Sequence, residues 1–149
     1  MAKTKILLKA RLIVEDQGKI LLLKQTKGQG GKYTLIGGTV EDNEFAKKAL
    51  IRESFEESGI IIEKQDLHLV HTLHKKKNDA TRIVLYFKAS KWEGELTLGE
   101  PNKFKKVAWH PIDNLPKSMS DTVGHVLKHY RRGSRYSEMM VGVEVKSQG

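Results

Sequence analysis

Residues 38–60, GTVEDNEFAKKALIRESFEESGI, combine the start and stop signals of a helix with a concentration of acids near its end. Asp42 and Asn43 are side chains that cap a helix by accepting hydrogen bonds from its first free N–H groups. Gly59 readily adopts the left-handed conformation that ends a helix. The sequence therefore predicts a helix from about Glu44 to Ser58.

One face of this helix changes character along its length. At about 100° per residue, its first half is an apolar stripe, formed by Phe45, Ala46, Ala49 and Leu50. Its second half carries three acids on the same stripe, Glu53, Glu56 and Glu57. Like charges three or four residues apart destabilise a helix, and carboxylates near its C-terminus oppose the helix dipole. Arg52 lies four residues before Glu56 and can offset one charge, which leaves two.

A bound divalent cation would offset the remaining acids. Carboxylates are hard oxygen ligands, so the expected ion is Mg²⁺ or its near relative Mn²⁺. The alternative is a solvated acidic helix end that binds nothing.

Length and composition set wider limits. The chain has 149 residues, 38% of them apolar and 30% charged, which suits a single globular domain over residues 1–149. No apolar run reaches the roughly 18 residues of a membrane span, and the N-terminus lacks the pattern of a signal peptide. The absence of cysteine excludes disulfides and a cysteine nucleophile, and it agrees with a cytoplasmic location. The net charge of +9 either attracts polyanions such as nucleotides and RNA or only confers solubility.

Strand patterns surround the predicted helix, and a second helix is expected over residues 120–132. Mixing strands with two helices indicates an α/β or α+β class. The expected strands are Ile6–Val14, Lys19–Gln25, Tyr33–Ile36, Leu67–Leu73, Thr81–Ala89 and Phe104–His110. In the tail after residue 132, Val141, Val143 and Val145 alternate, which suits a strand shared with a second copy in a homodimer.

The residues fit the pattern G-x5-E-x7-R-E-x-x-E-E-x-G followed by an aliphatic residue. This pattern resembles the signature of the Nudix hydrolase family, and the chain looks like a MutT-like member. The resemblance covers residues 4–132 as the core of the domain and is specific over residues 33–60. Two positions depart from the family's habits: Ser54 stands in place of an aliphatic residue, and Ile36 where proline is common.

The resemblance implies an α/β/α sandwich with a mixed central sheet, and hydrolysis of a nucleoside diphosphate linked to another group. It implies that Glu53, Glu56 and Glu57 bind the metal, with a backbone carbonyl of Gly37 or Gly38. It further implies that Arg52 orients a glutamate and that Glu44 supports the preceding loop. These assignments come from the family and not from the composition or spacing of this chain.

Glu53 is the first candidate for the general base, and its alternative role is metal ligand only. Glu100, in a turn ahead of the last expected strand, is the second candidate for base or further ligand; the alternative is an ordinary turn residue. Lys24 and Lys32 flank a glycine-rich loop and either meet substrate phosphates or remain solvated.

The expected recognition elements are less distinct. Asp121 lies in the segment that recognises the base in similar MutT-type proteins. Arg82 begins a strand and either reaches the cleft or stays at the surface.

Three functions remain open. The favoured one is a Mg²⁺-dependent pyrophosphohydrolase of a small nucleotide, with a nucleoside triphosphate as the leading substrate. The second is a hydrolase of RNA 5′ ends or of dinucleoside polyphosphates, which the positive charge would help. The third is a non-catalytic domain that senses a nucleotide, which intact Glu53, Glu56 and Glu57 disfavour.

Overall fold

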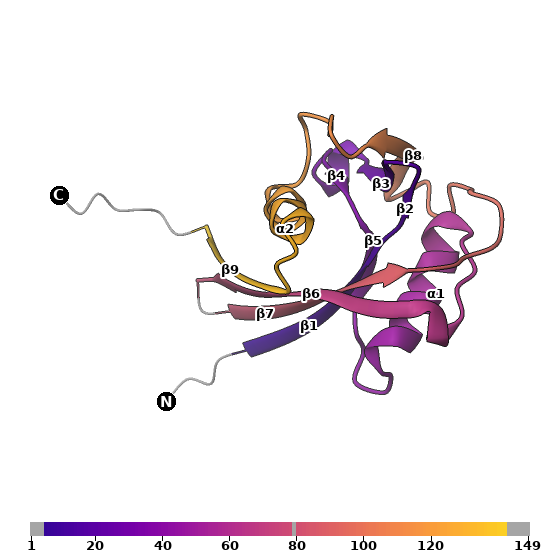
Figure 1. Cartoon of the computed structure of the whole chain (residues 1–149). Coiled ribbons are helices and arrows are strands. Elements are labelled where there is room, and N and C mark those ends of the chain that lie inside the picture. The colour runs from indigo at the N-terminus through magenta and orange to yellow at the C-terminus, as the bar shows by residue number, and fades with distance from the viewer. Residues whose placement is uncertain (1–4, 79, 143–149) are drawn as a thin grey trace.

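The computed structural model describes residues 5–78 and 80–142. These residues form two β-sheets with one α-helix against each of two opposite sides (Figure 1). The elements in chain order are β1 (Lys5–Ile13), β2 (Glu15–Asp16), β3 (Lys19–Gln25), β4 (Tyr33–Thr34), β5 (Ile36–Thr39), α1 (Ala46–Ser58), β6 (Leu67–Lys77), β7 (Ala80–Ala89), β8 (Phe104–Pro111), α2 (Asp121–Arg131) and β9 (Tyr136–Val141), with short 3₁₀ turns at Lys27–Gln29 and Lys64–Asp66.

The larger sheet is mixed and has the strand order β5-β1-β7-β6-β9. Strand β1 is parallel to β7 and β6 is parallel to β9, while the other neighbours are antiparallel. The smaller sheet is antiparallel, and in it β3 pairs with β2, β4 and β8. The expected fold class, a mixed α and β fold with a mixed sheet, is therefore confirmed.

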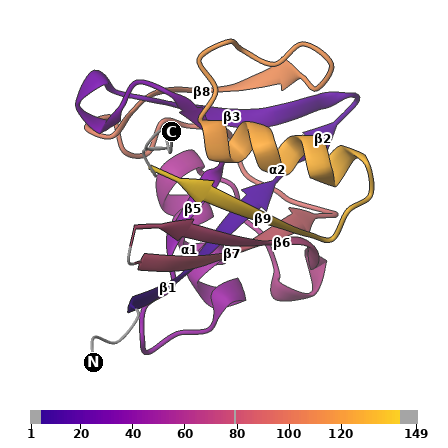
Figure 2. The ribbon, with the colours of Figure 1, turned by 90° about the vertical axis from the view of Figure 1, so that its left-hand side faces the viewer.

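The two helices cover different cores. Strand β3 contributes to both, because alternate residues of a strand point to opposite faces. Leu21 and Leu23 pack in one core with Leu50 of α1. Ile20 and Leu22, from the same strand, pack in the other core with Val126 of α2. Figure 2 shows α2 lying across the larger sheet near β6 and β9, with α1 behind that sheet. Among the described residues, no helix is long and apolar enough to cross a membrane.

The expected start of α1 was wrong by two residues, whereas its end was right. Phe45, in extended conformation, occupies the N-cap position, and no side chain caps the helix. The Phe45 side chain is 87% exposed, so the apolar stripe begins at Ala46. A turn closed by the Glu41 N–H, which donates to the Glu44 carboxylate at 3.2 Å, replaces the expected cap. Gly59 ends the helix in left-handed conformation, and its N–H donates to the Phe55 carbonyl.

A strand in the C-terminal segment was not expected at the observed place. Strand β9 runs over Tyr136–Val141 and extends the larger sheet beside β6. Val143 and Val145 of the expected alternating tail lie outside the described residues. The idea of a strand shared between two copies stays a prediction.

Candidate functional site

Three carboxylates from two segments meet at one end of α1. Glu53 and Glu57 are one helical turn apart on α1, and Glu100 comes from the connection between β7 and β8. One oxygen from each side chain lies within 4.8 Å of the others. The three residues are positioned to share a single cation.

The connection that carries Glu100 is held against the end of α1 by backbone hydrogen bonds. The Thr97 N–H donates to the Ser58 carbonyl at 2.9 Å, and the Gly99 N–H donates to the Glu57 carbonyl at 3.2 Å. The connection thus satisfies carbonyl groups that a helix end leaves unpaired. A Cβ atom at Gly99 would lie 1.8 Å from the Glu56 carbonyl oxygen, so only glycine permits this approach. The position of Glu100 therefore depends on Gly99, the residue just before it.

The glycines of β5 form the opposite wall of the site. The Gly37 N–H donates to Glu57 Oε1 at 3.0 Å, which fixes one oxygen of that carboxylate. Gly37 has a φ of +140°, and a Cβ there would lie 2.1 Å from the Ala10 carbonyl oxygen. A Cβ at Gly38 would lie 3.1 Å from Glu53 Oε1, so the strand passes directly beside that carboxylate. The backbone contact requires glycine at position 37, whereas Gly38 brings the strand close to the Glu53 carboxylate.

The electrostatics of the cluster fit a divalent cation. Glu57 is only 4% exposed, and burial raises the pKa of its carboxyl from 4.5 to about 8. The neighbouring charges of Glu53 and Glu100 act on this pKa in the same direction, while the Gly37 N–H and Arg11 oppose them. Oε1 of Glu100 is buried and has no hydrogen-bond partner within the described part of the chain. Hard oxygens that are crowded together and partly buried suit Mg²⁺ or Mn²⁺.

Arg52 lies beside the cluster and holds three acids. Its Nη2 donates to Glu44 at 2.8 Å, and its Nη1 donates to Glu53 at 3.3 Å and to Glu56 at 3.5 Å. The hydrogen bond from Arg52 lowers the pKa of the Glu44 carboxyl. Glu44 is thereby a fixed anchor for the guanidinium, and the guanidinium in turn restricts the carboxylate of Glu53.

Glu56 is placed differently from the other expected ligands. Its side chain is 45% exposed and is paired with Arg52, outside the group of three close oxygens. Ser54 is fully buried and donates to the Leu50 carbonyl at 2.7 Å, on a different side of α1 from the acids. The expected ligand role of Glu56 stays a prediction.

The residues expected to bind substrate do not form one group. Lys24 Nζ donates to Ser118 Oγ at 3.3 Å and lies 4.5 Å from the centroid of the Tyr33 ring. Lys32 is exposed in the connection before β4, and Asp121 is exposed at the first residue of α2. Their roles in binding substrate stay predictions.

Three cationic residues near the site were not foreseen. Lys9, Arg11 and Lys75 line a cavity of about 130 Å³ together with Arg82, one of whose two expected positions was the cleft. The spacing of Lys9 and Arg11 put them on one face of a strand, but nothing in the sequence shows which strands lie next to it.

Comparison with known proteins identifies the family. A sequence model of the NUDIX domain matches residues 9–130. The ADP-ribose pyrophosphatase of Methanocaldococcus jannaschii is 31% identical over 80% of this chain and 70% of its own length. The oxidized purine nucleoside triphosphate hydrolase of Danio rerio is 31% identical over 72% of this chain and 67% of its own length.

Other matches are partial or structural. The NAD-capped RNA hydrolase NudC of Escherichia coli O157:H7 is 29% identical over 69% of this chain, which spans only 38% of that relative's length. The crystal structure of the mMutator MutT protein from Bacillus halodurans superposes with a TM-score of 0.76 at 23% identity, covering 91% of this chain and 90% of the other. At this identity the superposition shows a shared fold and no more.

Proposed function

The chain belongs to the Nudix hydrolase family, and from that premise we propose that it is a Mg²⁺-dependent pyrophosphohydrolase of a small nucleotide, with a nucleoside triphosphate as leading substrate. The observation that carries the proposal is the meeting of Glu53, Glu57 and Glu100 within 4.8 Å, with Glu57 buried. Such a cluster is costly unless it binds cations. The same residues have the chemistry that cleavage of a diphosphate requires.

In this proposal, Glu53, Glu57 and Glu100 hold the metal with the backbone of Gly38 beside them, and Glu56 adds a ligand from the exposed side. When bound, divalent cations neutralise a diphosphate and lower the pKa of an attacking water. The chain's own residues keep the carboxylates in place. The Gly37 N–H fixes Glu57, and the Arg52 guanidinium fixes Glu53 from the other side.

Glu53 is our first choice for the general base. It takes the proton of the water that attacks phosphorus, while Arg52 prevents its carboxylate from rotating away. Glu100 is the second choice, because its buried Oε1 lacks a partner among the described residues and is free to accept a proton. Replacing each residue by glutamine, followed by the pH dependence of kcat, distinguishes the two.

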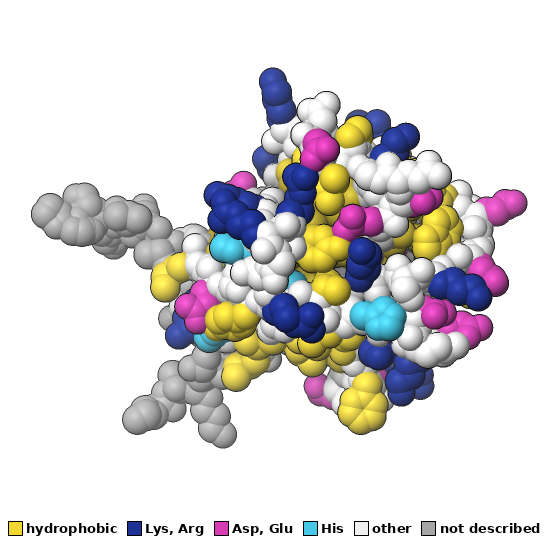
Figure 3. Space-filling model, viewed as in Figure 1, with side chains coloured by type: hydrophobic (Ala, Val, Ile, Leu, Met, Phe, Trp, Pro, Cys, Tyr) yellow, Lys and Arg dark blue, Asp and Glu magenta, His cyan; other side chains and the backbone are white. Residues whose placement is uncertain are grey.

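The relatives support the diphosphate chemistry and leave several substrates open. Of the two with broad coverage, one is named for a nucleoside triphosphate and one for ADP-ribose. The relative that is named for RNA hydrolysis matches this chain over only 38% of its own length. Figure 3 shows Lys and Arg side chains at separate places on one face, interspersed with acids, and not as the continuous basic stripe typical of nucleic-acid binding.

The test is Mg²⁺-dependent release of phosphate or pyrophosphate over a panel of nucleoside triphosphates, ADP-ribose, dinucleoside polyphosphates and capped RNA. The variant Glu57→Gln should lose activity, and Glu93→Gln, which removes an exposed acid, should keep it. A flat panel with tight nucleotide binding would instead establish the sensor alternative. The expected cytoplasmic location and homodimer stay predictions alongside this one.

A further inference from the structure

The cavity lined by Lys9, Arg11, Lys75 and Arg82, called the cationic cavity below, lies on the α2 side of the larger sheet. Its four cations come from three adjacent strands, β1, β6 and β7. The remaining lining side chains are neutral, and no carboxylate is among them. A volume of about 130 Å³ is well above the roughly 10–15 Å³ that one ordered water needs, so a tetrahedral oxyanion fits.

The sheet register forces these cations together. Lys9 and Arg11 are two residues apart and therefore point to the same face of β1. Lys75 of β6 stands directly opposite Arg82 of β7 in the antiparallel pair. Like charges directly opposite each other destabilise a sheet. The stability of the fold therefore does not explain why four cations meet at this place.

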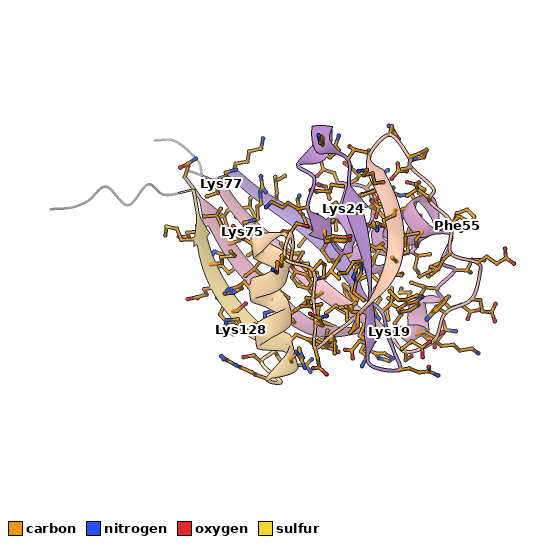
Figure 4. All side chains as sticks on the ribbon, turned by 90° about the horizontal axis from the view of Figure 1, so that it is seen from above. Lys19, Lys24, Phe55, Lys75, Lys77 and Lys128 are labelled. Atoms are coloured by element: carbon orange, nitrogen blue, oxygen red, sulfur yellow. The ribbon has the colours of Figure 1, made fainter. Side chains whose placement is uncertain are left out.

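The charges are not neutralised by the protein. Among residues 5–78 and 80–142, none of the four cations forms a salt bridge. Lys75 Nζ donates to the hydroxyl of Thr122 at 2.7 Å, and Arg82 Nε is buried without a hydrogen-bond partner in the same described part. In Figure 4, Lys75 lies beside α2. Thr122 is in the first turn of α2, whose dipole adds further positive potential.

Burial and the repulsion between these cations lower the pKa values of two lysines in the cavity. Burial lowers the pKa of Lys9 from 10.5 to about 8, and the charges of Arg11, Arg82 and Lys75 act in the same direction. Burial also lowers the pKa of Lys75, with Arg82 as the next cause. A bound anion would counter the repulsion between these cations and raise both pKa values.

The cationic cavity adjoins the carboxylate site through Arg11. Its Nη1 donates to the carbonyls of Leu35 at 3.0 Å and Gly37 at 3.2 Å. The N–H of the same Gly37 donates to Glu57. Arg11 therefore contacts the same residue of β5 that holds Glu57.

Resting on the proposed function, we propose that the cationic cavity binds a phosphate group of the substrate beyond the diphosphate that is cleaved. The preferred substrates then carry a further phosphate, either as an extension of the polyphosphate chain or as a separate phosphate monoester. A neutral base in the cavity would leave four cations unpaired, whereas a phosphate accepts charge-assisted hydrogen bonds from several of them.

The first experiment measures binding without turnover. Inorganic pyrophosphate is titrated by calorimetry into the metal-free protein in EDTA, where the carboxylate cluster repels anions. Arg82→Gln should raise the Kd about tenfold, as expected for one lost charge-assisted hydrogen bond. Lys19→Met removes the same charge from an exposed position away from Lys75 (Figure 4) and should leave the Kd unchanged. A thermal melt of Arg82→Gln at or above wild type shows that the variant is folded.

The second experiment compares substrate pairs that differ only in further phosphate, in the presence of Mg²⁺. Diadenosine diphosphate and tetraphosphate test the longer chain, and NADH and NADPH test the monoester. In at least one pair, the phosphate-rich member should have a kcat/KM about tenfold higher, and Arg82→Gln should abolish that advantage. Equal turnover within both pairs, or equal pyrophosphate binding by wild type and Arg82→Gln, overturns the inference and leaves the hydrolase proposal intact. Cavity-dependent binding without hydrolysis of any substrate overturns the hydrolase proposal and leaves the anion site standing.

Discussion

Among individual residues, Glu57 makes the stability of the protein depend on pH in a defined direction. Burial raises the pKa of its carboxyl from 4.5 to about 8. Between these values the folded protein retains a proton that the unfolded chain has lost. The free energy of unfolding therefore falls as pH rises through this window, when no metal is present.

Urea denaturation in EDTA at pH 5 and pH 8 measures this effect. Wild type should lose more stability between the two pH values than Glu57→Gln, whose side chain does not titrate. Glu93→Gln, at an exposed position, serves as the control and should follow wild type. Identical losses in wild type and Glu57→Gln would show that Glu57 is ionised throughout.

Arg52 offers a second test at the same scale, since we expect it to position Glu53 and not to contact the substrate. Removing its hydrogen bonds with Arg52→Ala should lower kcat by about 10- to 100-fold, a range typical of residues that orient metal ligands. KM should change little. Arg131→Ala removes an arginine that pairs with exposed Asp113 and should leave both constants unchanged. A change confined to KM would place Arg52 on the substrate instead.

At the scale of elements, the end of α1 and the connection carrying Glu100 act as one unit. In Gly99→Ala, the new Cβ would meet the Glu56 carbonyl oxygen at 1.8 Å, so the connection must move away from the helix. Glu100 would leave the cluster, and activity should fall by a larger factor than stability explains. Gly28→Ala adds the same methyl group where no atom lies within 4 Å and is the matched control. Wild-type activity in Gly99→Ala would show that Glu100 is dispensable.

The same elements show where sequence patterns were sufficient. The stop at Gly59 is a local signal, read within one helix, and the structure agrees with it. Of the three acids expected on one stripe, Glu53 and Glu57 lie close together, whereas Glu56 is half exposed and pairs with Arg52. The start of α1 was wrong because a turn over residues 41–44 competes with the caps at 42 and 43. Strand β9 was not predicted because its single buried residue is the polar Ser137, whose hydroxyl lies 2.7 Å from His71 Nε2.

For the whole molecule, the order of strands was the information that the sequence lacked. Lys9, Arg11, Lys75 and Arg82 meet only because β7 lies between β1 and β6. Residues so far apart in the chain give no periodic signal of their proximity. Glu100 was expected from family resemblance alone, and its contact with α1 depends on Gly99, far from the helix in sequence. Long-range packing, and not local propensity, set both features.

The carboxylate cluster couples metal binding to the stability of the whole fold. A ligand that binds only the folded state stabilises it by RT ln(1 + [L]/Kd), about 2.7 kcal/mol at one hundred times Kd. For a chain of this size, this corresponds to a rise in Tm of about 5–10 °C. Thermal melts over a Mg²⁺ series should show a rise that grows with the logarithm of concentration. The rise should be lost in Glu57→Gln and kept in Glu93→Gln, since only Glu57 belongs to the cluster. An equal rise in both variants would mean that Mg²⁺ acts elsewhere, and the account of these carboxylates as a metal site would fail.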